Sequence, residues 1–256
     1  FFLTLCAEMV LAPRSWAQVT WRRTYGGFGS DQAASIRQLE DGGFIVTGSS
    51  GSFGTGGGDI YALKIDSDGQ PIWTRTYGTL GADHGVAGFP FQGGVLLAGS
   101  VSLGPVGGYD MTLVHVDQIG AHLWTKYYGT TEWDLAYGSI PLSDGALVVG
   151  ETFGHGQLQG AGYAVRVDLE GDTIWTRVVS MGGGTKCSGA CPSVDGGFIL
   201  AGEREDPVGD VDGFLCKLNA IGEMQWTYMF DGDSTDVLRS VVQKPSGEIV
   251  ACGGTA

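Results

Sequence analysis

The stretch "DSDGQPIWTRTYG", residues 66–78, decides the fold, because most of it returns along the chain at a fixed spacing. Tryptophan recurs at intervals of 52, 51, 51 and 51 residues, at Trp21, Trp73, Trp124, Trp175 and Trp226. Four of these tryptophans follow the same turn, in which an Asp or Asn precedes a Gly by three positions and the Trp by seven. The structural anchors of this repeat are Asp66, Gly69, Trp73, Asp117, Gly120, Trp124, Asp168, Gly171, Trp175, Gly222 and Trp226.

Each repeat also carries the signals of four short strands. In the first full unit these are "AASIRQLE", "GFIVTGSS", "DIYALKID" and "QPIWTRTY", and the turns "EDGG" and "DSDG" are typical of tight hairpins. Four antiparallel strands in about 51 residues are typical of a β-propeller blade, whereas solenoid repeats are usually shorter. We therefore predict an all-β propeller of four-stranded antiparallel blades.

About five blades are visible, and the last one is incomplete. An orphan fourth strand is expected at residues 18–25, and the blades at about 31–78, 83–129, 134–180 and 185–231, with a partial blade at 236–256. The orphan strand at residues 18–25 could serve as the fourth strand of the last blade, but the third strand of that blade is missing. The number of blades in the intact protein stays open.

The small residues of the repeat fit this geometry. A small residue stands fourteen positions after each Trp, on the first and innermost strand of each blade: Ser35, Ala87, Gly138, Gly189 and Ser240. We expect the inner strands to crowd together there. A second set is expected where one blade packs on the next: Leu63, Val114, Val165 and Cys216.

The N-terminal residues 1–17, "FFLTLCAEMVLAPRSWA", are typical of a secretory signal peptide truncated at its start, with cleavage after Ala17. We therefore expect a secreted or cell-surface protein. No later segment is apolar for the length of a transmembrane span. The formal charge of −14 and the lack of a Lys/Arg patch argue against a nucleic-acid partner.

The cysteines predict neither a disulfide nor a metal site. Cys187 and Cys191 are four residues apart on an expected strand, roughly 13 Å at strand rise, which is too far for a regular disulfide. We interpret these two, together with Cys216 and Cys252, as small core residues.

The repeat resembles two known propeller patterns. The Asp-x-x-Gly-x-x-x-Trp run is similar to the tryptophan-docking motif of quinoprotein-type propellers, and the "IVTG" strand is similar to kelch blades. Over residues 18–256 the chain resembles secreted bacterial propeller-repeat proteins common in Bacteroidetes, which are often lipoproteins or carry a type IX secretion sorting domain. This resemblance implies an architecture and an extracellular location. Quinone-dependent oxidation is disfavoured, since the chain lacks the adjacent cysteines that hold the quinone cofactor in quinoprotein dehydrogenases.

Ligand binding is expected on the face that carries the long loops, residues 49–59, 100–110, 151–162 and 203–213. Just before each inner strand stand Asp31, Asp83, Asp134, Thr185 and Asp236. Four carboxylates at one mouth of a channel would suit a cation or acid–base chemistry on a sugar. The interpretation we favour is that each Asp accepts hydrogen bonds from amides of its own loop.

Other candidates on this face break the repeat. His84 and His155 could contribute to ligand binding, and Trp133 and Phe53 could stack on sugar rings. The acidic loop 203–212 could take up Ca²⁺, although a solvated loop is the simpler interpretation; no other cofactor is expected. Asp66 and Asp68 do not form a calcium loop, because only Asp66 has counterparts in comparable turns.

The catalytic residues are unknown from the sequence, and two functions stay open. The first is a non-enzymatic binding or structural module for glycan or protein ligands. The alternative is a polysaccharide hydrolase or lyase on the same fold. An enzyme should show polar residues that break the repeat and converge in one deep pocket, whereas a binding module could spread its contacts over repeated loops.

Overall fold

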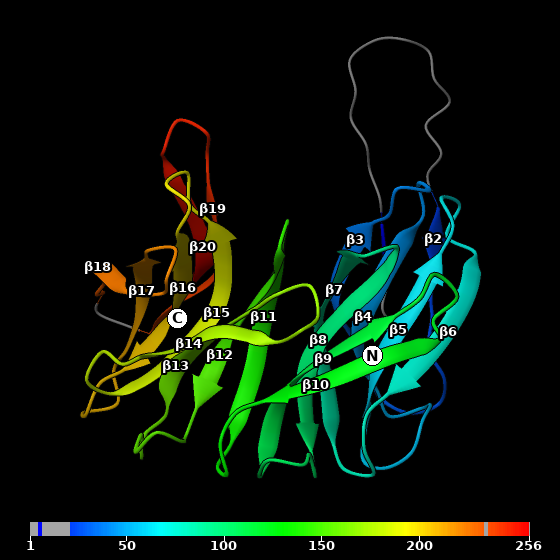
Figure 1. Ribbon diagram of the computed structural model, residues 1–256, viewed down its shortest axis with the longest axis horizontal. Helices are drawn as coiled ribbons and strands as arrows, with labels where there is room; N and C mark the ends of the chain where they lie inside the picture. Colours follow the sequence, from blue (N-terminus) through cyan, green and yellow to red (C-terminus); the bar gives the residue numbers. More distant parts are fainter. Residues whose placement is uncertain (1–4, 7–20, 233–234, 256) are drawn as a thin grey trace.

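The computed structural model describes residues 5–6, 21–232 and 235–255 (Figure 1). The regular structure of these residues consists of strands, in four four-stranded and two two-stranded sheets. Neighbouring strands within each blade are antiparallel, and the predicted all-β propeller is confirmed. Among the described residues no helix is long and apolar enough to cross a membrane.

The four complete blades follow one another along the chain. Blade 1 comprises β3 Asp31–Gln38, β4 Phe44–Ser50, β5 Asp59–Ile65 and β6 Pro71–Tyr77. Blade 2 comprises β7 Asp83–Phe91, β8 Gly94–Ser102, β9 Tyr109–Val116 and β10 His122–Tyr128. Blade 3 comprises β11 Asp134–Leu142, β12 Gly145–Thr152, β13 Ala161–Val167 and β14 Thr173–Val179. Blade 4 comprises β15 Gly184–Pro192, β16 Phe198–Glu205, β17 Val211–Leu218 and β18 Met224–Phe230.

Two shorter sheets complete the described structure. The partial blade 5 comprises β19 Asp236–Gln243 and β20 Ile249–Thr255, and β1 Leu5–Cys6 pairs with β2 Arg22–Arg23. The rest of the predicted signal peptide lies outside the described residues, so cleavage after Ala17 stays a prediction. Figure 1 shows the blades side by side in chain order, and the first strand of each contacts the first strand of the next.

The core lies between neighbouring blades, because the second and third strands of blades 1–4 are covered on both faces. Leu113 of β9 packs in one buried cluster with Val148 of β12 and Val165 of β13. This double burial explains why these strands are nearly continuous apolar runs rather than alternating ones. The residues predicted to pack between blades are all buried. Each has a relative exposure of at most 2%: Leu63, Val114, Val165 and Cys216.

The inner strands are crowded, as the small residues predicted. A Cβ atom on Gly138 would lie 2.9 Å from the Ser188 carbonyl oxygen, and one on Gly189 would lie 2.8 Å from that of Arg239. Each inner strand also has a β-bulge that the sequence did not reveal, one position before the small residue. A bulge re-aims the side chain of the extra residue. The bulged residues are Ala34, Val86, Tyr137, Ser188 and Arg239.

The Asp-x-x-Gly turn between strands three and four, which we call the docking turn, is held by its first residue. Asp168 Oδ1 accepts hydrogen bonds from the Glu170 and Asp172 amides, at 3.0 and 2.8 Å. Asp66 and Asp117 form the same two bonds in their own turns. This Asx-type bonding fixes the turn without help from the rest of the blade.

Each docking turn packs on the blade that precedes it. Trp73 Nε1 donates a hydrogen bond of 2.9 Å to the Gln118 carbonyl, and the Tyr77 hydroxyl donates one of 2.7 Å to the Gly120 carbonyl. Tyr128 bonds to the Gly171 carbonyl in the same way, at 2.7 Å. The repeat motif is therefore a joint between blades.

None of the four cysteines whose side chains the structure describes forms a disulfide, and three of them are buried. Cys187, Cys191 and Cys216 lie in the core, as predicted, and burial raises the pKa of each thiol. The prediction for Cys252 was wrong, because this residue is exposed on β20. Among the described residues β20 has only β19 as a strand partner, so its side chains lack the third-strand neighbour that buries the equivalent positions in blades 1–4.

We predict that Gly171→Ala destabilises the protein by about 1–3 kcal/mol more than Gly93→Ala. Both glycines adopt a left-handed backbone conformation, with φ of +77° and +75°. The backbone penalty of introducing Ala is therefore the same in both variants. A Cβ at position 171 would lie 2.8 Å from the Trp124 ring, whereas nothing lies within 4 Å of one at position 93. Urea unfolding of both variants measures the difference, and equal losses would show that the docking contact contributes little.

Candidate functional site

The long loops and the connections into the inner strands share one face of the propeller. The Gly57 amide donates to the Gly81 carbonyl at 3.0 Å, and the Asp83 amide donates to the Gly58 carbonyl at 2.9 Å. In blade 3 the Phe153 amide donates to the Trp133 carbonyl at 2.8 Å. These bonds bring residues that break the repeat together on the long-loop face.

The aspartates at the start of the inner strands hold their own loops. Asp31 accepts from the Gly27 amide at 2.8 Å and from the Ser50 and Ser52 hydroxyls at 2.6 Å. Asp83 accepts from the Ser102 amide at 2.9 Å, and Asp134 from the Thr130 amide and hydroxyl at 2.6 and 3.0 Å. These carboxylates therefore contribute to loop structure, which was the interpretation favoured from the sequence.

The other two inner-strand positions differ. Thr185 is buried, and its hydroxyl donates to the Gly183 carbonyl at 3.3 Å. Asp236 begins β19 and is partly exposed. A ligand role for Asp31, Asp83, Asp134 or Asp236 stays a prediction.

A second set of carboxylates, at the start of the third strands, was missed at the sequence level. Asp59 and Asp110 are 5% and 0% exposed, and each stands 24 residues before an inner-strand Asp of the next blade, Asp83 and Asp134. At the interface of blades 3 and 4 both positions are neutral, Ala161 and Thr185. The two carboxyl groups are thus absent together, as expected of groups that lie close to each other across a blade interface. This joint absence was the signal available in the sequence.

The pair between blades 2 and 3 is electrostatically strained. Asp110 Oδ1 and Asp134 Oδ1 are buried and have no hydrogen-bond partner among the described residues. Burial raises the pKa of Asp110, and the neighbouring Asp134 raises it further.

Aromatic side chains form a connected row on the long-loop face. His84 stacks on Tyr109 at a centroid distance of 6.3 Å, and Trp133 meets the same Tyr109 edge to face at 5.5 Å. Trp133 in turn contacts Phe153 at 6.4 Å. The row joins two of the four predicted candidates, His84 and Trp133. The other two lie apart from it: His155 contacts Tyr163 at a centroid distance of 5.7 Å, and Phe53 stacks on Tyr61 at 5.9 Å.

The row ends in a pocket of about 340 Å³ that spans blades 3 and 4. Its apolar side is formed mainly by Trp133, which is 53% exposed, and by Phe153. Its polar residues are Tyr137, Glu151, Gln159, Lys186, Glu203 and Glu205.

Glu151 on β12 is the most buried acidic residue of this pocket, with a relative exposure of 3%. The Tyr137 hydroxyl, on the bulge of β11, donates to Glu151 Oε2 at 3.0 Å. Burial raises the pKa of Glu151 above its ordinary 4.5, and Glu203 and Glu205 act in the same direction. The Tyr137 hydrogen bond and Lys186 oppose this shift.

Glu203 on β16 has a different environment. Lys186 Nζ lies 3.3 Å from Glu203 Oε1, and the guanidinium of Arg239, on the bulge of β19, lies 3.5 Å from Oε2. The pocket therefore holds two acids in unlike surroundings, one hydrogen-bonded to a phenol and one paired with two cations.

These two glutamates depart from the repeat. The strand register places Ser49, Ser100, Glu151 and Glu203 at equivalent positions of the second strands. The serine hydroxyls accept hydrogen bonds from amides of the next inner strand, Gly85 at 3.2 Å and Ala136 at 2.8 Å. The replacement of a structural Ser by Glu in blades 3 and 4 was the signal available in the sequence, but it required the strand register to be recognised.

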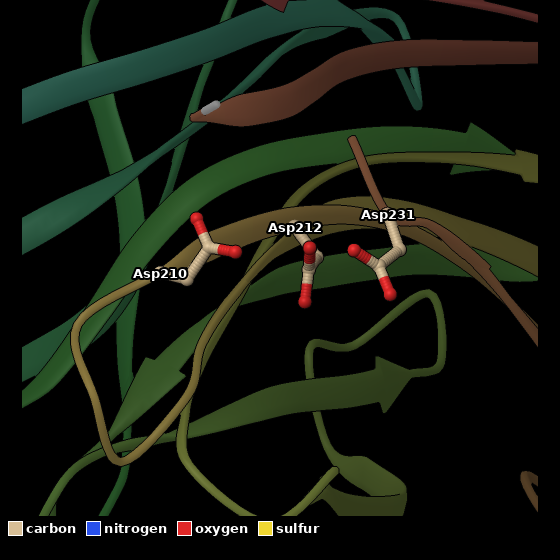
Figure 2. Close-up of side chains that lie close together, drawn as sticks. All are labelled: Asp210, Asp212 and Asp231. Atoms are coloured by element: carbon tan, nitrogen blue, oxygen red, sulfur yellow. The ribbon is translucent and has the colours of Figure 1, made fainter. Parts of the chain in front are cut away.

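Within the described part of the chain, one group of acidic side chains could hold a metal ion. Asp210, Asp212 and Asp231 each offer a carboxylate oxygen within 4.8 Å of the others (Figure 2). No ligand in this group comes from a histidine or a cysteine. It lies on blade 4, beside the pocket residue Val211.

The sequence matches no known family model and no curated protein. Among solved structures, an endo-arabinase from Bacteroides thetaiotaomicron is similar at 12% identity and a TM-score of 0.49, over 84% of this chain and 86% of that one. The catalytic domain of a GH62 α-L-arabinofuranosidase from Coprinopsis cinerea is similar at 10% identity and a TM-score of 0.42, over 88% and 73%. Drosophila Plexin A, in complex with Semaphorin 1b, is similar at 8% identity and a TM-score of 0.38, over 86% and 72%.

We predict that Asp110→Asn is more stable than the wild type at neutral pH, when both proteins are kept in a chelator. The folded-state pKa of Asp110 is raised above its ordinary 3.8, so the wild type loses stability as the pH rises through that raised pKa. An amide avoids this cost and can donate to the unpartnered oxygen of Asp134.

Thermal unfolding between pH 3 and pH 8 measures the effect, with the exposed Asp68→Asn as the control. The higher stability of Asp110→Asn should disappear at the acid end of this range. The Asp110 carboxyl of the wild type is then protonated in both the folded and the unfolded state. A variant less stable than the wild type at every pH would contradict the prediction.

Proposed function

We propose that this propeller is a secreted or cell-surface enzyme that hydrolyses a polysaccharide in the pocket between blades 3 and 4. The observation that carries the proposal is the convergence of Glu151 and Glu203, two acids that break the repeat, in a pocket lined by Trp133. Of the two functions left open by the sequence, this asymmetry favours the enzyme.

Glu151 has the environment of a general acid. Glycoside hydrolysis needs one carboxylic acid that protonates the departing oxygen and one carboxylate that acts as a base or a nucleophile. Burial raises the pKa of Glu151, which favours its protonated form at a higher pH than for an exposed Glu. Tyr137 orients the carboxyl through the 3.0 Å hydrogen bond.

Glu203 supplies the second carboxylate. Its contacts with Lys186 and Arg239 provide positive charge beside a group that must act in the ionised form. Lys186 also donates a hydrogen bond of 3.3 Å to Oε1, which restrains this end of the carboxylate. Unlike environments for two nearby acids are the arrangement that separates a catalytic acid from a catalytic base.

The aromatic row supplies a binding surface for the sugar chain. Trp133 is 53% exposed and borders the acids, and Tyr109 and His84 continue the row over blade 2. Pockets commonly combine aromatic walls with a few placed polar groups. An extracellular location is supported by the predicted signal peptide at residues 1–17 and by the charge of −14.

We predict that Glu151→Gln lowers the turnover number on a polysaccharide by about 10²–10⁴-fold while glycan binding is retained. The loss should be smaller on an aryl glycoside whose leaving group needs no protonation, because the acid then has less to contribute. Wild-type activity should fall as the pH rises through the raised pKa of Glu151. Reducing-end release from neutral and uronic-acid polysaccharides measures the activity, with the exposed Glu132→Gln as the control.

Two outcomes would contradict the proposal. If the wild type binds a glycan but releases no reducing ends, the pocket belongs to a non-enzymatic binding module. If a polysaccharide is cleaved equally well by Glu151→Gln, Glu203→Gln and the wild type, the reaction takes place elsewhere.

A further inference from the structure

We propose that Asp210, Asp212 and Asp231 bind a calcium ion on blade 4. Two oxygen ligands of one Ca²⁺ ion, at 2.3–2.6 Å each, are at most about 5 Å apart. One carboxylate oxygen from each of these three residues meets this limit, since these three atoms lie within 4.8 Å of one another. Figure 2 shows the carboxylate of Asp212 between those of Asp210 and Asp231.

One carboxylate oxygen of the central residue lacks a hydrogen-bond partner among the described residues. Asp212 is 6% exposed, and its Oδ1 is buried with no hydrogen-bond partner among the described residues. A buried carboxylate oxygen that accepts no hydrogen bond is costly, unless a cation or a shared proton compensates it. The described residues supply no hydrogen bond to this oxygen, and a bound cation would compensate it.

The positive charge available nearby is insufficient. Among the described residues, the cation that faces the group is Arg204, whose Nη2 lies 3.8 Å from Asp212 and 4.0 Å from Asp206, both beyond hydrogen-bond distance. Asp210 and Asp231 add to the negative charge around Asp212. One guanidinium thus faces four carboxylates.

The arrangement is confined to blade 4, although its central residue is part of the repeat. Asp59 and Asp110 are equivalent to Asp212 in blades 1 and 2. Two residues before them stand Gly57 and Gly108, where blade 4 has Asp210. Five residues after the repeat Trp stand Gly78 and Gly129, where blade 4 has Asp231.

The local fold presents Asp210 to the group. Asp206 Oδ1 accepts from the Val208 and Asp210 amides at 2.9 and 3.0 Å, which closes a turn immediately before Asp210. The ligands are all oxygens, which suits Ca²⁺ rather than zinc or copper. Ca²⁺ also tolerates irregular geometry better than Mg²⁺. Since Val211 lines the pocket, the ion would brace one of its walls, but the proposal does not depend on catalysis.

The test uses the whole chain stripped with a chelator and titrated with CaCl₂ or MgCl₂. We expect calorimetry to give a calcium Kd of about 10⁻⁴–10⁻³ M, typical of extracellular sites, and the melting temperature to rise with calcium more than with magnesium. Asp210→Gly and Asp231→Gly, which restore the residues of blades 1 and 2, should weaken calcium binding at least about tenfold. The exposed Asp68→Asn should bind calcium like the wild type.

Asp212→Asn separates a metal ligand from a structural residue. In chelator this variant should be at least as stable as the wild type, because it removes one of several like charges. In calcium it should be the less stable of the two. No response of the wild type to millimolar calcium, or equal calcium binding by Asp210→Gly and the wild type, would overturn the proposal. Stabilisation by acid alone would show that a shared proton satisfies Asp212.

Discussion

The packing of each docking turn on the Trp of the preceding blade is the contact on which the rest of the structure depends. A single four-stranded sheet cannot bury both of its faces, so each blade requires its neighbour. The turn glycine makes the contact possible, because a Cβ on Gly171 would lie 2.8 Å from the Trp124 ring. The Trp and Tyr hydrogen bonds then fix the register between blades.

Repetition explains the scaffold, and departures from it explain the site. Where each blade needs the same contact, the same residue type recurs. Ser49 and Ser100, for example, each accept a hydrogen bond from an amide of the next inner strand. Glu151 and Glu203 replace these serines in two adjacent blades and meet in one pocket. The β-bulges contribute as well, since they direct Tyr137 and Arg239 toward the two acids.

Several buried carboxylate oxygens on the long-loop face lack a hydrogen-bond partner among the described residues. Asp31 and Asp83 are satisfied by amides and hydroxyls, whereas Asp110, Asp134 and Asp212 each keep a buried oxygen without a hydrogen-bond partner among the described residues. Asp110 and Asp212 differ in their surroundings. Asp110 faces one carboxyl across a blade interface, while Asp212 lies among additional carboxylates that only blade 4 provides.

The sequence by itself determined the repeat, the four-stranded blade, the crowded inner strand and the face with the long loops, because each depends on spacing and on local turn chemistry. It also singled out Trp133 as a residue that breaks the repeat. Only the tertiary structure decided which residues meet across blades: the docking turn with the preceding Trp, Glu151 with Glu203, and Asp212 with Asp231. These contacts join residues about 20 to 50 positions apart, and a bulge or one residue of register determines them, so neither periodicity nor composition could reveal them.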